Sequence, residues 1–173
     1  MDKMTAVLAN RLYDNGKLAA EDIEVTLPAI EAQVFELKAM GSFNVVLPGL
    51  FNSMEMTIKI TGATRQYASI AGFGKHKFTI TVAQNKVATS GSITPKQFKA
   101  VITAVGKKIG DLSIVPGEAA QPESAYEVVR YEAYEDGKTM WIVDKLNSIC
   151  KVYDVSMNKL IDYGSQITNL LKA

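Results

Sequence analysis

The residue types used most often in catalysis and metal binding are scarce in this chain and stand far apart. His76 is the only histidine and Cys150 the only cysteine among the 173 residues. A cysteine nucleophile needs a partner that stabilises its thiolate, and a Cys-rich zinc site or a disulfide framework needs more cysteines. Two flanking cations, Lys75 and Lys77, disfavour protonation of His76. We predict a surface histidine, a half-buried structural cysteine and no metal site.

Two other motifs have the residue types for chemistry, but each lacks the context that the chemistry needs. Glu135 and Asp136 are adjacent carboxylates in a turn signal that ends at Gly137, where solvation explains them. Acid–base catalysis by carboxylates requires two of them in a shielded pocket. Gly72-Phe73-Gly74 follows a predicted helix, whereas a nucleotide-binding glycine loop follows a strand and precedes a helix. The sequence therefore predicts that the protein is not an enzyme and has no cofactor.

Length and composition predict one soluble domain over residues 1–173. The chain is long enough for a real core, and its hydrophobic content of 47% is ordinary for a globular protein. A net charge of +1, with lysines and glutamates interspersed, gives no sign of nucleic-acid or membrane binding. The apolar run after Met1 is too short for a signal peptide, and no segment reaches the length of a membrane span. We expect no membrane anchor.

The most informative segment predicts two long strands, Glu24–Ala39 and Met54–Thr61. In the second, apolar side chains at even positions alternate with polar ones at odd positions, which indicates a half-buried strand. In the first, the apolar positions change phase at Pro28 and again at the Val34-Phe35 pair. A strand that changes faces needs bends or bulges, which suit a barrel or a strongly coiled sheet.

The connection between these two strands is unusually apolar. Connections in monomers are normally short and polar, but this one carries six large apolar residues between breaks marked by glycine and proline. We predict an interface loop at residues 40–53 that another protein surface covers. A buried omega-like loop over the end of a barrel is the alternative. The predicted inter-subunit residues are Phe43, Val45, Val46, Leu47, Leu50 and Phe51.

Shorter patterns predict the remaining elements. An N-terminal arm or loop spans residues 1–22, with Met4–Leu12 as a short helix or an extended arm before a turn at Asn15-Gly16. The C-terminal segment, 156–173, belongs to a helix predicted for Val155–Leu171 and interrupted near Gly164. The others are a helix at Thr64–Ala71, a strand at Phe78–Val82, a loop at Pro116–Pro122, and a hairpin of Tyr126–Tyr134 with Lys138–Leu146. Trp141 lies in the second hairpin arm, where core packing and interface anchoring both fit.

The segment Thr94–Gly110 carries signals of both helix and strand. Thr94, Pro95 and Gln97 match an N-cap, a first-turn proline and a capping-box partner. The β-branched run Val101-Ile102-Thr103 instead suits a strand. The residues alone favour the helix.

The order of these features resembles one known family. The similar pieces are the Asp14-Asn15-Gly16 turn, the run Glu24-Val25-Thr26-Leu27-Pro28, a loop from Gly41, and a strand ending in Ile60-Thr61-Gly62. They continue with Gly106 to Ile114, then Pro116-Gly117-Glu118 and the Tyr126 to Leu146 hairpin. Over nearly the whole chain, this order is similar to the major tail tube proteins of contractile-tailed phages and of phage-tail-like bacteriocins (R-type tailocins).

The resemblance implies a mainly β fold, namely a small antiparallel β-barrel or sandwich with a flanking short helix and a long hairpin. It implies that hexameric rings form one continuous inner β-barrel and stack into a hollow tube inside a contractile sheath. It also implies a strand at about Phe98–Ile109, against the capping signal, and we adopt that prediction. The implied function is a structural conduit, for DNA passage in a phage or membrane puncture in a bacteriocin.

The resemblance further implies a set of partners. These are the chain itself, a sheath protein, a tape-measure protein, and baseplate and tail-terminator proteins, with DNA only as non-specific passing cargo. Synthesis and assembly would take place in the bacterial host cytoplasm, and the product would be a virion tail or an extracellular tail-like particle. The alternatives are the tube of a type VI secretion or related injection system, and a monomeric β-barrel module that binds a small apolar ligand.

If the two long strands form the wall of a tube, one polar face of each strand lines the lumen. Such a surface stays hydrated and does not grip a passing polymer. The predicted lumen-facing residues are Glu31, Gln33, Glu36, Lys38, Glu55, Thr57 and Lys59.

Overall fold

The computed structural model describes residues 2–165 and 169 and shows a mainly β protein. Between residues 2 and 164, one short helix, α1 (Arg65–Ile70), accompanies the strands, as the sequence predicted. The strands are β1 (Asp2–Asp14), β2 (Lys17–Glu21), β3 (Glu24–Thr26), β4 (Ala32–Lys38), β5 (Ser42–Phe51), β6 (Glu55–Lys59), β7 (Lys75–Ala88), β8 (Ile93–Lys108), β9 (Glu123–Glu135), β10 (Lys138–Asp144), β11 (Ile149–Asp154) and β12 (Lys159–Asp162).

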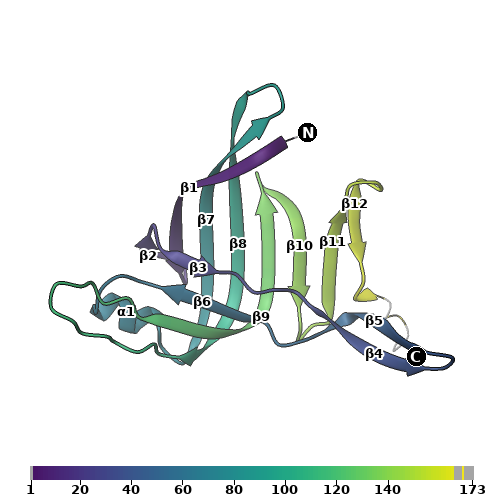
Figure 1. Cartoon of the computed structure of the whole chain (residues 1–173), viewed down its shortest axis with the longest axis horizontal. Helices are drawn as coiled ribbons and strands as arrows, with labels where there is room; N and C mark the ends of the chain where they lie inside the picture. The colour runs from purple at the N-terminus through teal and green to yellow at the C-terminus, as the bar shows by residue number, and fades with distance from the viewer. Residues whose placement is uncertain (1, 166–168, 170–173) are drawn as a thin grey trace.

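Ten of these strands form one antiparallel sheet that branches at β9 (Figure 1). The main strand order is β12-β11-β10-β9-β8-β7-β1-β2. On the side away from β8, the first half of β9 pairs with β6, where Tyr126 lies opposite Met56. The second half of β9 pairs with β10, where Arg130 lies opposite Asp144. Strand β3 pairs with β6 and completes the second branch.

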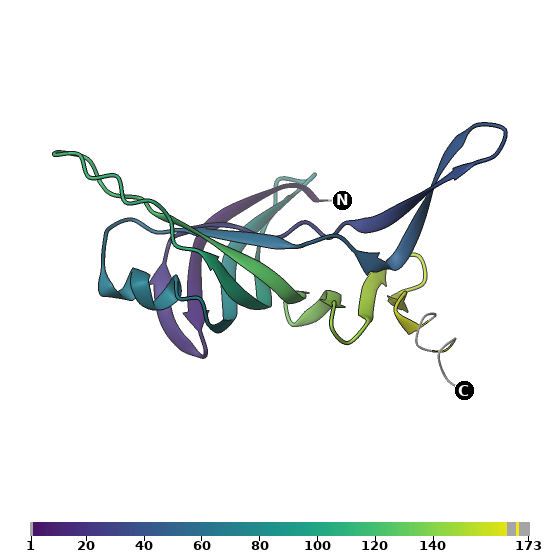
Figure 2. The ribbon, with the colours of Figure 1, turned by 90° about the horizontal axis from the view of Figure 1, so that it is seen from below.

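The two branches of the sheet enclose the hydrophobic core. In Figures 1 and 2, β3 and β6 cross over the long strands β1, β7 and β8. The described strands do not close into a barrel, because β2 and β12 remain the two ends of the main strand order. The predicted mainly β, antiparallel fold is therefore confirmed, but in the described residues its sheet is open and not a closed barrel. Fully buried core residues are Leu12, Met54, Met56, Ile58, Phe78, Ile102 and Tyr126.

The predicted alternation in the strand that begins after Met54 is confirmed by β6. Met56 and Ile58 have no exposed surface, whereas Glu55 on the opposite face is exposed. Burying side chains of this size contributes on the order of 1.5–3 kcal/mol each. Because successive strand residues point to opposite faces, this burial also fixes which polar side chains face outward.

The ambiguous segment forms strand β8, which confirms the strand prediction and rules out the helix. β8 pairs with β7 from Ile93 to Val105, but its pairing with β9 begins only at Phe98. Pro95 therefore lies in the part of β8 that has a neighbour on one side only, where its missing N–H is tolerated. Two long partner strands outweigh the local capping signal, because tertiary pairing overrides intrinsic propensity.

Both chain ends differ from the sequence predictions. Residues 2–21 form a hairpin of β1 and β2, and β1 also pairs with β7, so they are extended as one alternative predicted but are not a free arm or loop. The predicted helix at Val155–Leu171 is wrong over its first part, because β11 and β12 form a hairpin through Lys159–Asp162. Asn158 takes a left-handed φ of 49° in the turn, so the apolar spacing there reflects a tight turn between strands. Residues 166–168 and 170–173 lie outside the described residues.

Helix α1 is fixed to the core by buried hydroxyl groups. The Tyr67 hydroxyl accepts hydrogen bonds from the Gly110 N–H at 3.0 Å and from the Ser124 hydroxyl at 2.8 Å. The Tyr126 hydroxyl donates to the Ile70 carbonyl at 2.8 Å. Burial raises the pKa of Tyr126, so this hydroxyl stays protonated and keeps donating. These bonds join α1 to β9 and to the start of the loop after β8.

A second polar network ties β9 to β10 around the buried carboxylate of Asp144. Its oxygens accept from Arg130 Nη1 at 3.0 Å, from Asn147 Nδ2 at 2.8 Å, and from the backbone N–H groups of Leu146 and Asn147. Burial alone would raise the pKa of Asp144, but these hydrogen bonds outweigh it and hold the pKa below its ordinary value.

This network predicts a loss of stability in acid. A carboxyl whose pKa is lower in the folded chain stabilises the fold above its unfolded pKa of about 3.9, and this stabilisation is lost as the pH falls through the folded value. We expect Asp144→Asn to lower the urea midpoint at pH 7 and to differ less from wild type at pH 3. Asp111→Asn, at an exposed loop position, serves as the control. An unchanged difference between pH 7 and pH 3 would contradict the assignment.

Candidate subunit interface

The most unusual feature of the molecule is the hairpin formed by β4 and β5, which stands away from the body (Figure 2). These two strands form a sheet of their own. Near the base, the Asn52 N–H donates to the Glu31 carbonyl at 2.9 Å, and at the tip the Ala39 N–H donates to the Gly41 carbonyl at 3.1 Å. The connection predicted as a loop at 40–53 is thus largely strand β5, paired with β4.

The register of this hairpin separates its side chains into two different faces. Residues directly opposite each other in an antiparallel pair share a face. Phe35 lies opposite Val45, Leu37 opposite Phe43, and Gln33 opposite Leu47. We call these six residues the apolar hairpin face. Residues on the other face are Val34 with Val46, Glu36 with Asn44, and Lys38 with Ser42.

Most of the apolar hairpin face is exposed in the isolated chain, although Val45 and Leu47 are half-buried. Phe43 is 65% exposed and Phe35 is 57% exposed. Met40 at the tip is fully exposed. A two-stranded hairpin is at best marginally stable in water, and contiguous exposed apolar surface on a soluble protein marks an interaction site. This face therefore has the properties of a surface that a second protein covers.

The six interface candidates predicted from the sequence do not all lie in the same environment. Phe43, Val45 and Leu47 lie on the apolar hairpin face, and Val46 lies on the opposite face. Leu50 is exposed, whereas Phe51 packs against the core. The alternation of polar and apolar residues over Ser42-Phe43-Asn44-Val45, followed by the β-branched Val46, is the signal that would have identified a strand.

The predicted phase shift at Val34-Phe35 is wrong, and this changes the lumen-facing set. The irregularity falls between Ala32 and Gln33, where three extra residues of β5, 48–50, bulge out of the pairing. Strand β4 alternates without interruption, so Gln33 points to the apolar hairpin face, opposite to Glu36 and Lys38. Gln33 Nε2 donates to the Phe51 carbonyl at 3.3 Å. The single strand predicted for Glu24–Ala39 is wrong, since β3 ends at Thr26, β4 begins at Ala32, and the two strands belong to different sheets. Pro28 therefore marks a break between strands and not a bend within one.

The outward face of β6 carries charges that are paired across neighbouring strands. Glu55 accepts from Lys107 Nζ at 2.5 Å, and Lys59 Nζ lies 3.8 Å from a Glu24 carboxylate oxygen. The hydrogen bond to Glu55 and its charge raise the pKa of Lys107. Thr57, between the two charged positions, is half-buried. The outward face of β6 is therefore polar.

His76 is buried, so the prediction of a surface histidine is wrong. Its Nδ1 lies 3.0 Å from Asp14 Oδ2 and its Nε2 lies 2.8 Å from the Gly72 carbonyl, while the ring stacks on Phe78. The alternation of β7 explains the difference, because it turns Lys75 and Lys77 outward and His76 inward. The histidine joins β1, β7 and the end of α1, which is a structural role.

The other residue types considered for chemistry also have structural environments. Cys150 is more buried than predicted, and burial raises its pKa, which keeps the thiol protonated and inert. Trp141 packs edge-on against Tyr131, with ring centroids 5.6 Å apart, so core packing accounts for it. Within residues 2–165, no three His, Cys, Asp or Glu side chains are grouped to hold a metal. Among the described residues, no helix has the length and apolar character of a membrane span.

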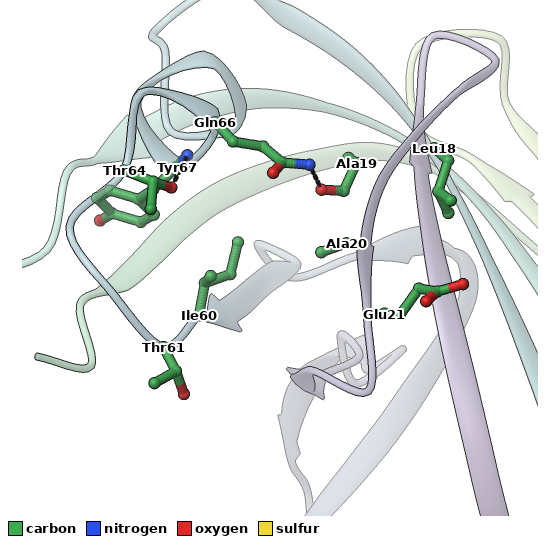
Figure 3. Close-up of a pocket in the computed structure, with 9 residues that line it drawn as sticks. All are labelled: Leu18, Ala19, Ala20, Glu21, Ile60, Thr61, Thr64, Gln66 and Tyr67. Atoms are coloured by element: carbon green, nitrogen blue, oxygen red, sulfur yellow. Dashed lines mark hydrogen bonds between the residues drawn. The ribbon is translucent and has the colours of Figure 1, made fainter. Parts of the chain in front are cut away.

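The hollow between α1 and β2 does not assemble a catalytic set (Figure 3). Gln66 extends from α1 and donates to the Ala19 carbonyl of β2. The one carboxylate among its lining residues, Glu21, pairs with Arg11 at 2.8 Å. The hollow lies between β2 and the two residues that follow β6, Ile60 and Thr61.

Among the exposed apolar residues that the sequence did not predict, two groups stand out. The first is the segment 109–115 after β8, and the second is the turn between β11 and β12, where Val155 is 81% exposed. The first had a signal, because Ile109, Leu112, Ile114 and Val115 precede a Pro-Gly turn without forming a regular helical or strand pattern. The second was hidden by the helix predicted for the same residues.

The chain is similar to known proteins of phage tails. The family model described as phage tail tube protein FII matches residues 5–161. Among solved structures, the chain matches the sheath–tube complex of PVC, an extracellular contractile injection system, in its extended state. That match has a TM-score of 0.49 and 14% identity, and it covers 72% of this chain and 87% of the other. No curated protein matches. Because the family model spans nearly the whole chain, the protein belongs to the phage tail tube protein FII family and is a structural subunit of a tail tube.

Proposed function

We propose that this chain builds the inner tube of a contractile tail, as hexameric rings stacked into a hollow conduit. The observation that carries the proposal is the apolar hairpin face, which the described part of the chain leaves uncovered. In a tail tube family, the surface available to cover it is a further copy of the same chain. The hairpin is then the arm that joins copies.

Assembly removes two costs that the isolated chain bears. Each large apolar side chain of the hairpin that becomes buried contributes on the order of 1.5–3 kcal/mol. The end strands β2 and β12 each have one partner strand in the described sheet, and such edges are templates for pairing with another chain. Joining copies into a continuous inner β-barrel removes the edges.

The outward face of β6 is our candidate for the wall of the lumen. Glu55, Thr57 and Lys59 lie opposite the buried residues of the same strand, so they point away from the core. Glu31, Glu36 and Lys38 are exposed and remain candidates, whereas Gln33 is removed because it shares the apolar hairpin face. A wall of paired charges holds water and passes a polymer without binding it.

The remaining partners follow from a place inside a contractile tail. We propose a sheath protein outside the tube, a tape-measure protein inside it during assembly, and baseplate and terminator proteins at its ends. DNA is passing cargo in a phage, and membrane puncture is the task in a bacteriocin. The protein is proposed to be non-enzymatic, and to be assembled in the bacterial cytoplasm into a virion tail or tail-like particle.

Negative-stain electron microscopy of the purified protein, combined with a cysteine in the lumen, tests this function. We expect rings or hollow tubes, and we expect Thr57→Cys in intact tubes to be shielded from a bulky thiol reagent added outside. The same variant should react when it is monomeric. The wild-type protein supplies the background, since its one cysteine is buried.

The matched control is Thr57→Cys combined with Phe43→Asp, which keeps the protein monomeric and the cysteine accessible. Equal labelling of Thr57→Cys in tubes and monomers would remove β6 from the lumen wall. Featureless monomers of the wild-type protein under all assembly conditions would contradict the tube function itself.

A further inference from the structure

A second apolar projection lies at the opposite end of the molecule from the hairpin. The segment 109–115 leaves the end of β8 as extended chain, and it forms no strand pairing in the described residues. Ile114 is 85% exposed, and Ile109, Leu112 and Val115 are each exposed by almost half. Figure 1 places this loop and the hairpin tip at the two ends of the longest axis, and in Figure 2 both rise from the same side.

The root of this loop is held firmly, so its apolar residues are presented on a fixed base. The Gly110 N–H donates to the buried Tyr67 hydroxyl, and Gly110 packs against the backbone of Glu123 too closely for any side chain. On the returning arm of the loop, Ala120 and Pro122 accept backbone hydrogen bonds from Gly62 and Ile60. A fixed base lowers the ordering cost of binding.

The geometry of a tube decides which two surfaces can meet. Copies that repeat in one orientation join through heterologous contacts, in which two different patches of the chain face each other. The exposed turn between β11 and β12 lies in the same half of the molecule as the hairpin (Figure 1). Of these two surfaces, only the loop at 109–115 lies in the other half of the molecule, so a neighbour in the same orientation can bring it toward the hairpin.

We infer that the apolar hairpin face of one copy packs against the 109–115 segment of a neighbouring copy. This inference rests on the proposed tube function and names the surface that the hairpin reaches. Phe35, Leu37 and Phe43 present large side chains from a flat strand face, and Leu112, Ile114 and Val115 present branched ones from an extended loop. Within the described residues, both surfaces carry exposed apolar side chains that the contact would cover.

Cysteine cross-linking between assembled copies tests this contact. We expect Phe43→Cys combined with Ile114→Cys to form intermolecular disulfides in tubes and to give a ladder of covalent multimers on denaturing gels. Each single variant should remain monomeric on the same gel. The hairpin and the 109–115 loop lie at opposite ends of the folded molecule, so a disulfide cannot form between the two positions within one copy. The matched control pairs Phe43→Cys with Met157→Cys, which is exposed at the hairpin's own end.

The outcomes separate this inference from the function on which it rests. Tubes that cross-link through 43 and 157, or through 43 alone, would overturn the contact and leave the tube function in place. Tubes of the 43/114 pair that do not cross-link under oxidation would also overturn it. A wild-type protein that forms no tubes would contradict the proposed tube function itself, and microscopy detects that result independently of any cysteine.

Discussion

Phe43→Asp is expected to stop tube assembly and to leave the monomer folded. Phe43 is 65% exposed in the isolated chain, so the substitution removes little packing from the monomer. In the assembled state it removes an apolar contact worth on the order of 1.5–3 kcal/mol per copy and places a carboxylate in a covered site. Sedimentation and electron microscopy measure assembly, and circular dichroism measures the fold.

Asn44→Asp is the matched control for this prediction. Asn44 is the next residue along β5, has the same partner strand and is also exposed, but it lies on the opposite face of the hairpin, beside Glu36. We expect this variant to assemble. If both variants assemble equally well, the apolar hairpin face is not the joint between copies. If both fail, added charge anywhere on the hairpin blocks assembly, and the distinction between its two faces is lost.

Gly106→Ala is expected to destabilise the monomer itself, independently of assembly. A Cβ atom at this position would lie 2.0 Å from the Gly72 carbonyl oxygen and 2.9 Å from the Phe73 Cα. Both are backbone atoms, so no side chain can rotate away. Overpacking of this kind costs about 3 kcal/mol, which lowers the melting temperature of a domain of this size by roughly 6–12 °C.

Gly74→Ala tests whether this loss comes from the contact or from removing a glycine. Gly74 lies in the same turn and its carbonyl accepts from the Gly106 N–H at 3.2 Å, but no atom stands within 4 Å of the position that a Cβ atom would take there. We expect its thermal melting curve to match wild type within about 0.5 kcal/mol. A Gly106→Ala protein as stable as Gly74→Ala would mean that β8 moves freely relative to the turn after α1.

Patterns with a period of two predicted the strands well wherever one face of a strand is buried by its neighbours. The alternation of Met56 and Ile58 with Glu55 identified β6, and the turn at Gly137 identified the β9–β10 hairpin. In these places local sequence and tertiary packing favour the same structure. The prediction failed at His76, which was expected on the surface because its neighbours Lys75 and Lys77 are charged. Adjacent residues of a strand face opposite ways, so the lysines point outward and the histidine inward.

Long-range pairing was the part that the residues could not specify. The capping signal at Thr94 favours a helix when read alone, and only pairing with β7 and β9 makes the segment a strand. The apolar spacing after Val155 likewise matched a helix, whereas the neighbouring strand β11 turned it into a hairpin. Strand pairing depends on residues far apart in the chain, which a local window does not contain.

By itself, the sequence determined that strands such as Met54–Thr61 alternate and that residues 43–51 are too apolar for an ordinary connection, because both features depend on composition and local periodicity. The order of its motifs predicted the mainly β fold through the family resemblance. Only the tertiary structure decided that the apolar residues form one face of a projecting hairpin and that a second apolar loop lies at the far end of the molecule. The physical reason is register, because a bulge of three residues in β5 sets which side chains share a face, and no property of those residues alone fixes where it falls.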